Sequence, residues 1–355
     1  MNKRLDMYLC YTTKNSCKSV KNLYDNSHFK EHLTLEGEIE FEKKALDLFA
    51  YQSAHNPVYR AYVQALSRTK QSINSSLSIP FLPISFFKTH TIRTGDFKPA
   101  TCFESSGTSG ERPSKHCIPS IQQYLENATA NFSEFYGDPS RFCVLALLPS
   151  YLERGNSSLV AMADHFIQLS SNPASGFFLN DFQDLANQLK INESIGTSTL
   201  LLGVTYALLD FAEQYPLSLQ QTIVMETGGM KGRRKEVTRD ELHAELIKAW
   251  GLTSVHAEYG MTELQSQAYS MGRGIFYPPA TLRVILRALD DPFDTWDWRM
   301  HPGRAGAINL IDLANHATQT FIATDDIGRF TGDGGFEITG RMDNCDIRGC
   351  SLLVV

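Results

Sequence analysis

The spacing of apolar and polar residues predicts a helical start followed by alternating helices and strands. Up to residue 75, apolar positions recur at helical spacing, and residues 39–66 carry this pattern most clearly. Pro80 and Pro83 interrupt the pattern and predict a connecting segment. Beyond this connector, segments with helical spacing alternate with short apolar runs, which is typical of an α/β fold.

The middle of the chain supplies most of the predicted α/β elements. Thr238 and Glu241 match a capping box, in which each side chain caps the other residue's N–H, so a helix is expected to begin there. Gly251 is suited to end this helix, because glycine readily adopts the left-handed conformation of a C-cap. The other expected elements are strands at residues 141–148, 198–204, 221–225 and 254–257 and helices at 118–136 and 205–215.

The last part of the chain has a different pattern. Residues 305–313 and 319–324 alternate apolar and polar positions, which predicts paired strands of a further lobe. We therefore expect three regions, namely a helical segment at residues 1–75, an α/β core at 76–270 and a β-rich lobe at 271–355.

Composition indicates an enzyme-like soluble chain and argues against several other classes. Of the 355 residues, 42% are hydrophobic and 20% are charged, which is typical of globular proteins. A net charge of −6 argues against a nucleic-acid partner, which usually requires a basic surface. The N-terminus lacks the apolar stretch of a signal peptide, and no apolar run reaches the roughly 20 residues of a membrane span. A cytoplasmic location is expected.

The cysteines and histidines show no metal-binding pattern. No Cys-x-x-Cys occurs, so a zinc site is not expected. The number of cysteines is odd and their spacings are scattered, so we expect them to be reduced thiols in a cytoplasm. The histidines are expected to be hydrogen-bonded structural residues, and the absence of Gly-x-Ser-x-Gly argues against an α/β-hydrolase. Cys143 lies in an apolar run and should be buried, whereas Cys350 follows Gly349 near the C-terminus. The cysteines are Cys10, Cys17, Cys102, Cys117, Cys143, Cys345 and Cys350, and the histidines considered are His90, His116, His165 and His256.

Residues 104–115 form a loop with the chemistry of a phosphate site. Its glycines permit close backbone approach to an anion, its hydroxyls and N–H groups can surround phosphate oxygens, and Lys115 adds a positive charge. The pattern matches neither the Walker A loop nor the dinucleotide fingerprint. A flexible surface loop is the alternative. The residues concerned are Ser105, Ser106, Gly107, Thr108, Ser109 and Gly110.

Three further segments follow in the sequence. Residues 256–263 read His-Ala-Glu-Tyr-Gly-Met-Thr-Glu, residues 324–328 read Thr-Asp-Asp-Ile-Gly, and residues 340–343 read Gly-Arg-Met-Asp. An aromatic ring can stack on a base, a hydroxyl can orient reacting groups, and a carboxylate is a suitable ligand for Mg²⁺. Taken singly, these segments could equally be a strand-to-helix turn and solvated loops.

Together, in this order and spacing, the four segments resemble the signatures of the acyl-adenylate-forming enzymes. The resemblance implies an α/β fold, that of the superfamily's large domain with its stacked α/β subdomains, and ATP and Mg²⁺ as cofactors. It implies that residues 105–110 and Lys115 contact phosphates and that Tyr259 lies along adenine. Thr262 would contact the substrate carboxylate and the α-phosphate, and Glu263 would help to hold Mg²⁺.

The same resemblance assigns the remaining nucleotide contacts. Asp326 would accept the ribose hydroxyls, with Arg341 nearby. Gly260 belongs to the tyrosine motif, and Gly228 and Gly229 would border the adenine after a strand.

The C-terminal residues, from Asp346 to Leu353, are similar to the tail of acyl-protein synthetases of the LuxE type, as are residues 79–88 and 148–158. Members of that family activate a fatty acid as acyl-AMP and carry the acyl group on a cysteine, which here would be Cys350. The resemblance implies an acyl-acceptor reductase or carrier as partner. Because the sequence ends at Val355, we expect the superfamily's small mobile C-terminal domain to be lacking.

Some residues depart from the family pattern. Four residues separate Gly110 from Lys115, Asp325 replaces a glycine, and the hinge is one residue shorter. Two other functions remain open, namely a ligase that passes the acyl group to coenzyme A or another small thiol, and a non-catalytic binding subunit. Whether Cys345 rather than Cys350 carries the acyl group also remains open.

Overall fold

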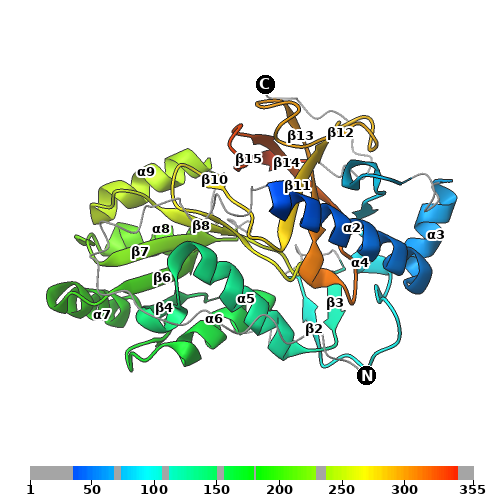
Figure 1. Ribbon diagram of the computed structural model, residues 1–355. Coiled ribbons are helices and arrows are strands. Elements are labelled where there is room, and N and C mark those ends of the chain that lie inside the picture. The colour runs from blue at the N-terminus through cyan, green and yellow to red at the C-terminus, as the bar shows by residue number, and fades with distance from the viewer. Residues whose placement is uncertain are drawn as a thin grey trace.

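The computed structural model describes residues 35–67, 73–105, 112–149, 156–179, 181–228 and 237–342. Within these ranges, most strands belong to one of two sheets, a six-stranded and a seven-stranded one, and a two-stranded hairpin precedes the strands of the six-stranded sheet in the chain. Figure 1 shows the six-stranded sheet with its helices on one side of the molecule and the seven-stranded sheet on the other. The α/β class expected from the sequence is confirmed.

The six-stranded sheet is parallel except at one edge. Its order is β5-β4-β6-β7-β8-β9, and only β9 runs antiparallel to its neighbour. Strands β4, β6 and β7 are buried throughout, because helices cover both faces of the sheet. The strands are β4 (Cys143–Leu147), β5 (Gly176–Phe177), β6 (Thr199–Val204), β7 (Thr222–Thr227), β8 (His256–Tyr259) and β9 (Ala268–Ser270).

Four of the covering helices pack as two pairs on the two faces. In Figure 1, α8 and α9 lie above this sheet, while α5 and α6 lie below it. The helices are α5 (Ile121–Tyr136), α6 (Ser158–Leu169), α7 (Phe182–Ile195), α8 (Thr205–Gln214) and α9 (Arg239–Trp250). The capping box of Thr238 and Glu241 is confirmed, as is the left-handed Gly251 at the end of α9.

The second sheet is antiparallel along its main path. Its order is β10-β15-β14-β13-β11-β12, and the two-residue strand β1 adds to β14 in parallel. The alternating segments predicted to pair do so, as β13 and β14. The strands are β1 (Leu82–Pro83), β10 (Ile275–Phe276), β11 (Leu282–Arg287), β12 (Thr295–Trp296), β13 (Ala305–Asp312), β14 (Phe321–Phe330) and β15 (Phe336–Arg341).

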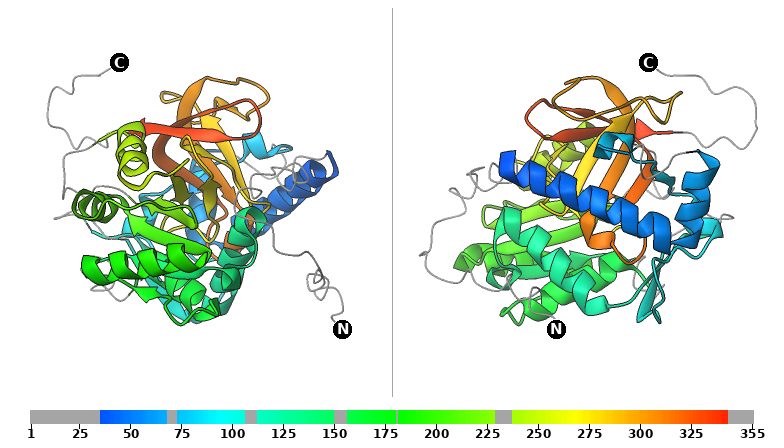
Figure 2. Two further views of the ribbon diagram at one scale, coloured as in Figure 1. Left: turned by 90° about the vertical axis from the view of Figure 1, so that its left-hand side faces the viewer. Right: turned by 45° about the vertical axis from the view of Figure 1, so that its right-hand side comes forward.

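The helical spacing noted over residues 39–66 corresponds to two helices, α2 (Leu35–His55) and α3 (Pro57–Ala65). Pro57 begins α3, and the Asn56 side chain accepts a hydrogen bond from the N–H of Tyr59, so the Asn-Pro pair ends one helix and starts the next. Helix α2 lies across the seven-stranded sheet (Figure 2). Phe49, Tyr59 and Phe321 form ring contacts at 6.1–6.3 Å under it.

The remaining elements are short. They are the helix α4 (Phe86–Thr89), the hairpin strands β2 (Thr101–Glu104) and β3 (Lys115–Ile118), and the 3₁₀ turns η3 (Ser76–Ser78), η4 (Pro139–Arg141) and η6 (Leu313–Asn315). In the part of the chain described, no helix is both long and apolar enough to cross a bilayer.

The β2–β3 hairpin corrects the expectation that every cysteine is a free thiol. Cys102 and Cys117 lie directly opposite each other on its two strands and are joined by a disulfide. Their spacing in the sequence gave no sign of this, because the pairing exists only once the hairpin forms. Cys143 is free and buried, as expected.

The buried apolar residues form two clusters that meet at β8. Val255, just before this strand, packs in the cluster of the six-stranded sheet, whereas Ala257 and Tyr259 pack in the cluster of the seven-stranded sheet. The loop that follows β8 is therefore held between two packed cores.

Asn56 provides a test of how α3 is held on the molecule. Its side chain caps α3 and also donates to the buried carbonyl of Thr318 at 2.9 Å. Asn56→Ala should lower the free energy of unfolding by about 2–3 kcal/mol, since it removes a cap worth about 1 kcal/mol and one donor to a buried carbonyl. Asn56→Ser, which keeps a capping oxygen, should recover about 1 kcal/mol. Urea unfolding measures the free energy of unfolding of each variant. Equal decreases in Asn56→Ala and Asn56→Ser would contradict the capping role of Asn56.

Candidate active site

The described parts of the four sequence segments come together where the two sheets meet. Tyr259 is the last residue of β8, so its motif starts at the carboxyl end of a parallel strand, where open α/β sheets bind ligands. The β2–β3 hairpin carries the phosphate loop, and β14 and β15 carry Asp326 and Arg341. The expected strand at residues 254–257 lies two residues later, at β8.

Tyr259 and Asp326 are joined across the two sheets. The Tyr259 hydroxyl donates to Asp326 Oδ2 at 2.8 Å, and the Tyr259 ring packs against Phe276 and Phe336. Burial raises the pKa of the Asp326 carboxyl, while the Tyr259 hydrogen bond and the charge of Arg341 oppose that rise. Arg341 is 72% exposed, and its Nε lies 3.9 Å from Asp326 Oδ1. Two residues expected to hold adenosine are thus in contact although 67 positions apart.

The base of the phosphate loop is joined to Glu263. Ser105 and Ser114 close the loop, because the Ser105 N–H donates to the Ser114 carbonyl at 3.1 Å and the Ser114 N–H donates to Ser105 Oγ at 2.9 Å. The Ser114 side chain lies close enough to the Glu263 carboxyl to lower the pKa of that group. Sequence reasoning missed Ser114, since one serine in a serine-rich loop carries no distinguishing signal.

Glu263 is a buried carboxylate that has the chemistry of a magnesium ligand. It is 5% exposed, and burial raises the pKa of its carboxyl, an effect opposed by the Ser114 hydrogen bond and the charges of Arg341 and Lys88. Among the described residues no three His, Cys, Asp or Glu side chains cluster as a metal site. A single carboxylate still fits, because Mg²⁺ at nucleotide sites is held by one or two carboxylates together with phosphate oxygens.

Lys115 stands at the edge of the phosphate loop as the first residue of β3. Its Nζ pairs with Glu104 Oε1 at 2.8 Å, and its side chain is 55% exposed. An exposed ion pair of this kind contributes little to stability, so Lys115 can exchange Glu104 for another anion at small cost.

Two glycines of the expected nucleotide site lie at the ends of β7 and β8. Gly228 directly follows β7 and has a φ of +70°, which favours glycine. At Gly260 a Cβ atom would lie 2.2 Å from Glu258 Oε1, so no larger residue fits without displacing that carboxyl. Ser106, Gly107, Thr108, Ser109, Gly110, Gly229, Cys345 and Cys350 lie outside the described residues.

Buried side chains anchor the main chain of the motif loop. His116 Nδ1 lies 2.8 Å from the Thr262 carbonyl oxygen, and the Asn315 amide donates to the Glu263 carbonyl at 2.8 Å. Asp312 accepts from the N–H groups of Gln265 and Ser266. His116 is hydrogen-bonded as expected, but nothing in the sequence indicated its partner or the roles of Asn315 and Asp312.

Two carboxyl groups are buried beneath the loop. Glu226 accepts from Arg239 Nε at 3.0 Å, whereas Glu258 accepts a 2.5 Å hydrogen bond from the Thr227 hydroxyl. Burial, with a smaller contribution from the nearby Glu226, raises the pKa of Glu258 to about 7 against the opposing effect of the Thr227 hydrogen bond. Glu258 therefore binds a proton more tightly in the folded protein than in the unfolded chain.

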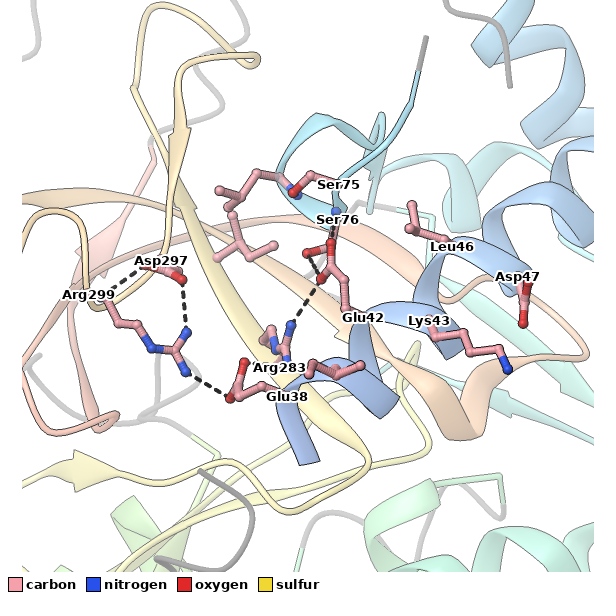
Figure 3. Close-up of a pocket in the computed structure, with 13 residues that line it drawn as sticks. Glu38, Glu42, Lys43, Leu46, Asp47, Ser75, Ser76, Arg283, Asp297 and Arg299 are labelled. Atoms are coloured by element: carbon pink, nitrogen blue, oxygen red, sulfur yellow. Dashed lines mark hydrogen bonds and ion pairs between the residues drawn. The ribbon is translucent and has the colours of Figure 1, made fainter. Parts of the chain in front are cut away.

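A pocket of about 590 Å³ lies elsewhere, between α2 and β11 (Figure 3). Arg283 pairs there with Glu38 at 2.9 Å and with Glu42 at 3.3 Å, and Arg299 pairs with Asp297 at 3.1 Å. Its arginines are thus already paired with acids. None of the motif residues lines it, so it is separate from the candidate active site.

The Glu258 carboxyl predicts a pH dependence of stability. Its pKa in the folded protein is about 7, above the ordinary value of 4.5. The contribution of this carboxyl to the free energy of unfolding of the wild type therefore falls as the pH rises from 4.5 to 7. The free energy of unfolding of Glu258→Gln, relative to that of wild type, should therefore rise by up to about 3 kcal/mol between pH 4.5 and 7. Above pH 7 this difference should stay constant. Urea unfolding between pH 4.5 and 8 tests this. Glu245→Gln, on the exposed face of α9, should follow the wild type. A constant difference between E258Q and wild type would contradict the assignment.

Comparison with solved structures identifies the fold. Two structures of 2-hydroxyisobutyryl-CoA ligase superpose on 87% of this chain, one in complex with R3-HIB-AMP and the other with 2-HIB-AMP and CoA. The TM-scores are 0.59 and 0.62, the identities 12% and 14%, and the alignments cover 68% and 69% of the ligase chains. The fold is therefore that of adenylate-forming ligases.

Comparison at the sequence level identifies the family. No curated protein matches the sequence significantly. The profile described as "Acyl-protein synthetase, LuxE" matches residues 32–355, which is most of the chain. With the ligase fold and the converging motifs, this match shows that the chain belongs to the LuxE family of acyl-protein synthetases.

Proposed function

We propose that this protein activates a carboxylic acid, a fatty acid in our assignment, with ATP to form acyl-AMP, and then takes the acyl group onto Cys350. The observation that carries the first step is the contact of Tyr259 with Asp326 on one side of the motif loop and of Ser114 with Glu263 on the other. These contacts join the segments expected to hold adenosine and phosphates. The family match supports the acyl-protein product.

Nucleotide binding is assigned to both sheets. The Tyr259 ring, bounded by Gly260, lies along adenine, with Gly228 and Gly229 at its border. Asp326 accepts the ribose hydroxyls as a pair of charged hydrogen bonds, with Arg341 beside it. Because Tyr259 already donates to Asp326, binding the ribose and stacking the base depend on the same contact.

The phosphates are assigned to residues 105–110, with Lys115 exchanging its partner Glu104 for a phosphate oxygen. Glu263 would hold the Mg²⁺ that accompanies ATP, and this ion supplies neutralisation of phosphate charge. The Ser114 hydroxyl keeps the Glu263 carboxylate beside the loop. Such a site acts by alignment and charge neutralisation and needs no strong base.

In the first half-reaction, Thr262 orients the substrate carboxylate so that one of its oxygens attacks the α-phosphorus of ATP. The bond between the α-phosphorus and the bridging oxygen breaks, and pyrophosphate leaves. The product is a mixed anhydride and hence a strong acyl donor.

In the second half-reaction, the Cys350 thiolate attacks the acyl carbon, a thioester forms, and AMP leaves. A thiol suits this step because it is nucleophilic near neutral pH. Cys350 must be a free thiol, because the thiolate is the nucleophile in this step. A reductase or an acyl carrier would then receive the acyl group.

Exchange of labelled pyrophosphate into ATP tests the first half-reaction. Wild-type protein with Mg²⁺ and a suitable fatty acid should catalyse exchange, and Thr262→Ala and Glu263→Ala should each lower its rate by at least about a hundredfold, as for loss of a transition-state contact. Ser270→Ala, a buried change on β9 away from the motif loop, serves as a folding control. Wild-type rates in both motif variants would overturn these roles, and no exchange with any acid would favour the binding-subunit alternative.

Intact mass measurement tests the second half-reaction. With ATP and acid, wild-type protein should gain one acyl group that hydroxylamine removes, as expected for a thioester. Cys350→Ser should still form acyl-AMP but gain no such group, whereas Cys345→Ser should gain it normally. An acyl group mapped to Cys345 would reassign the carrier. Acyl-AMP without any adduct, together with product formation on added coenzyme A, would favour the free-thiol ligase.

A further inference from the structure

Two neighbouring carbonyl groups of the motif loop are held by side chains from two other parts of the fold. His116 belongs to β3 of the phosphate hairpin, and its Nδ1 lies 2.8 Å from the Thr262 carbonyl oxygen. Asn315 ends the 3₁₀ turn η6 after β13, and its amide donates to the Glu263 carbonyl at 2.8 Å. In Figure 1 the connection between β13 and β14 lies beside the hairpin.

These two contacts act on opposite sides of one residue. The Thr262 carbonyl belongs to the peptide plane that precedes the Glu263 Cα, and the Glu263 carbonyl belongs to the plane that follows it. Because peptide units are planar, holding both planes restricts φ and ψ at Glu263 and so sets the direction of its Cα–Cβ bond. The Asp312 contacts with Gln265 and Ser266 hold the loop further along.

We propose that His116 is a positioning residue which, together with Asn315, clamps the peptide planes on both sides of Glu263 and thereby aims its carboxylate at the Mg²⁺ of bound ATP. This inference rests on the proposed function, because it assigns a direction to a carboxylate whose metal role is part of that function. It adds a requirement for a side chain that touches neither nucleotide nor acid.

The surroundings of His116 suit this role. The side chain is almost fully buried, and burial lowers the pKa of its imidazole to about 4, so the ring is neutral near pH 7. A carbonyl oxygen can only accept, so the single ring proton must be on Nδ1. Nε2 lies 2.8 Å from the Thr318 hydroxyl, which also contacts Asn315, so both clamping side chains meet at Thr318.

His116 and Asn315 contact only main-chain carbonyls, so the Glu263 side chain can interact with another group. Ser114, which lies two residues before His116 on the same hairpin, is close enough to the Glu263 carboxyl to lower the pKa of that group. The hairpin therefore controls the backbone of Glu263 through His116 and the end of its side chain through Ser114. A carboxylate held at both ends loses little freedom when it binds a cation, which favours binding.

Two amide substitutions separate the roles of the two ring nitrogens. In His116→Asn the side-chain amide nitrogen can occupy the position of Nδ1 and still donate to Thr262, whereas in His116→Gln the amide occupies the position of Nε2. We expect H116Q to raise the Mg²⁺ concentration for half-maximal pyrophosphate exchange by about fivefold to tenfold, as for loss of one hydrogen bond. H116N should raise it less than twofold.

Thr199→Val is the matched structural control. It removes a buried hydroxyl at the start of β6 that bonds to Asn192 and to the Thr197 carbonyl, and it touches neither clamping side chain. It should lower the melting temperature about as much as H116Q does and leave the Mg²⁺ requirement unchanged. If the Mg²⁺ requirement followed the melting temperature through all three variants, His116 would be merely structural and the inference would be wrong.

Hydrogen exchange gives a readout that does not depend on activity. In H116Q the backbone amides in residues 261–266 should exchange faster than in wild type without ligands, and in H116N they should remain protected. Equal protection in both variants would overturn the clamp. The wild-type protein could instead show the expected amide protection but catalyse no pyrophosphate exchange with any acid. That result would overturn the proposed function and leave the clamp with a structural role only.

Discussion

A buried hydrogen-bond network that joins the β2–β3 hairpin, the N-terminal helices and the β13–β14 connection is the interaction on which the candidate site depends. Thr318 is at its centre, since its carbonyl accepts from Asn56 and Thr94 while its hydroxyl contacts His116 and Asn315. These polar groups are nearly or completely buried, where an unpaired donor or acceptor costs about 1–3 kcal/mol. The network is therefore restricted to arrangements in which almost every member is satisfied, and this restriction holds the motif loop in place.

The network explains how a site made of distant segments can be precise. Loops that carry phosphate-binding or catalytic residues are usually mobile, so a rigid scaffold must position them. Here the loop after β8 lies between two apolar cores, and buried polar side chains hold its carbonyl and N–H groups. The Tyr259–Asp326 hydrogen bond adds a direct tie between the sheets at the nucleotide side. Away from the site, charged side chains pair with neighbouring groups of opposite charge, as the arginines do in the pocket between α2 and β11 (Figure 3).

The local sequence predicted features that depend on neighbouring residues. The capping box at Thr238 and the C-cap at Gly251 follow from side chains and φ angles within one helix, and the structure has both. The alternation that paired β13 with β14 is equally local. The break at Asn56 was missed because helical spacing on both sides of it hid the Asn-Pro signal. The Cys102–Cys117 disulfide was missed because only the hairpin brings the two residues together.

By itself, the sequence determined the fold class, the family and the identity of the side chains available for chemistry, because short motifs and apolar periodicity are properties of consecutive residues. Only the tertiary structure decided that Tyr259 contacts Asp326, that Ser114 reaches Glu263, and that His116 and Asn315 hold the carbonyls beside that carboxylate. These contacts join residues far apart in the chain and arise from packing two sheets against each other. A hydrogen bond depends on distance and direction to a partner, and no pattern along the chain encodes either one.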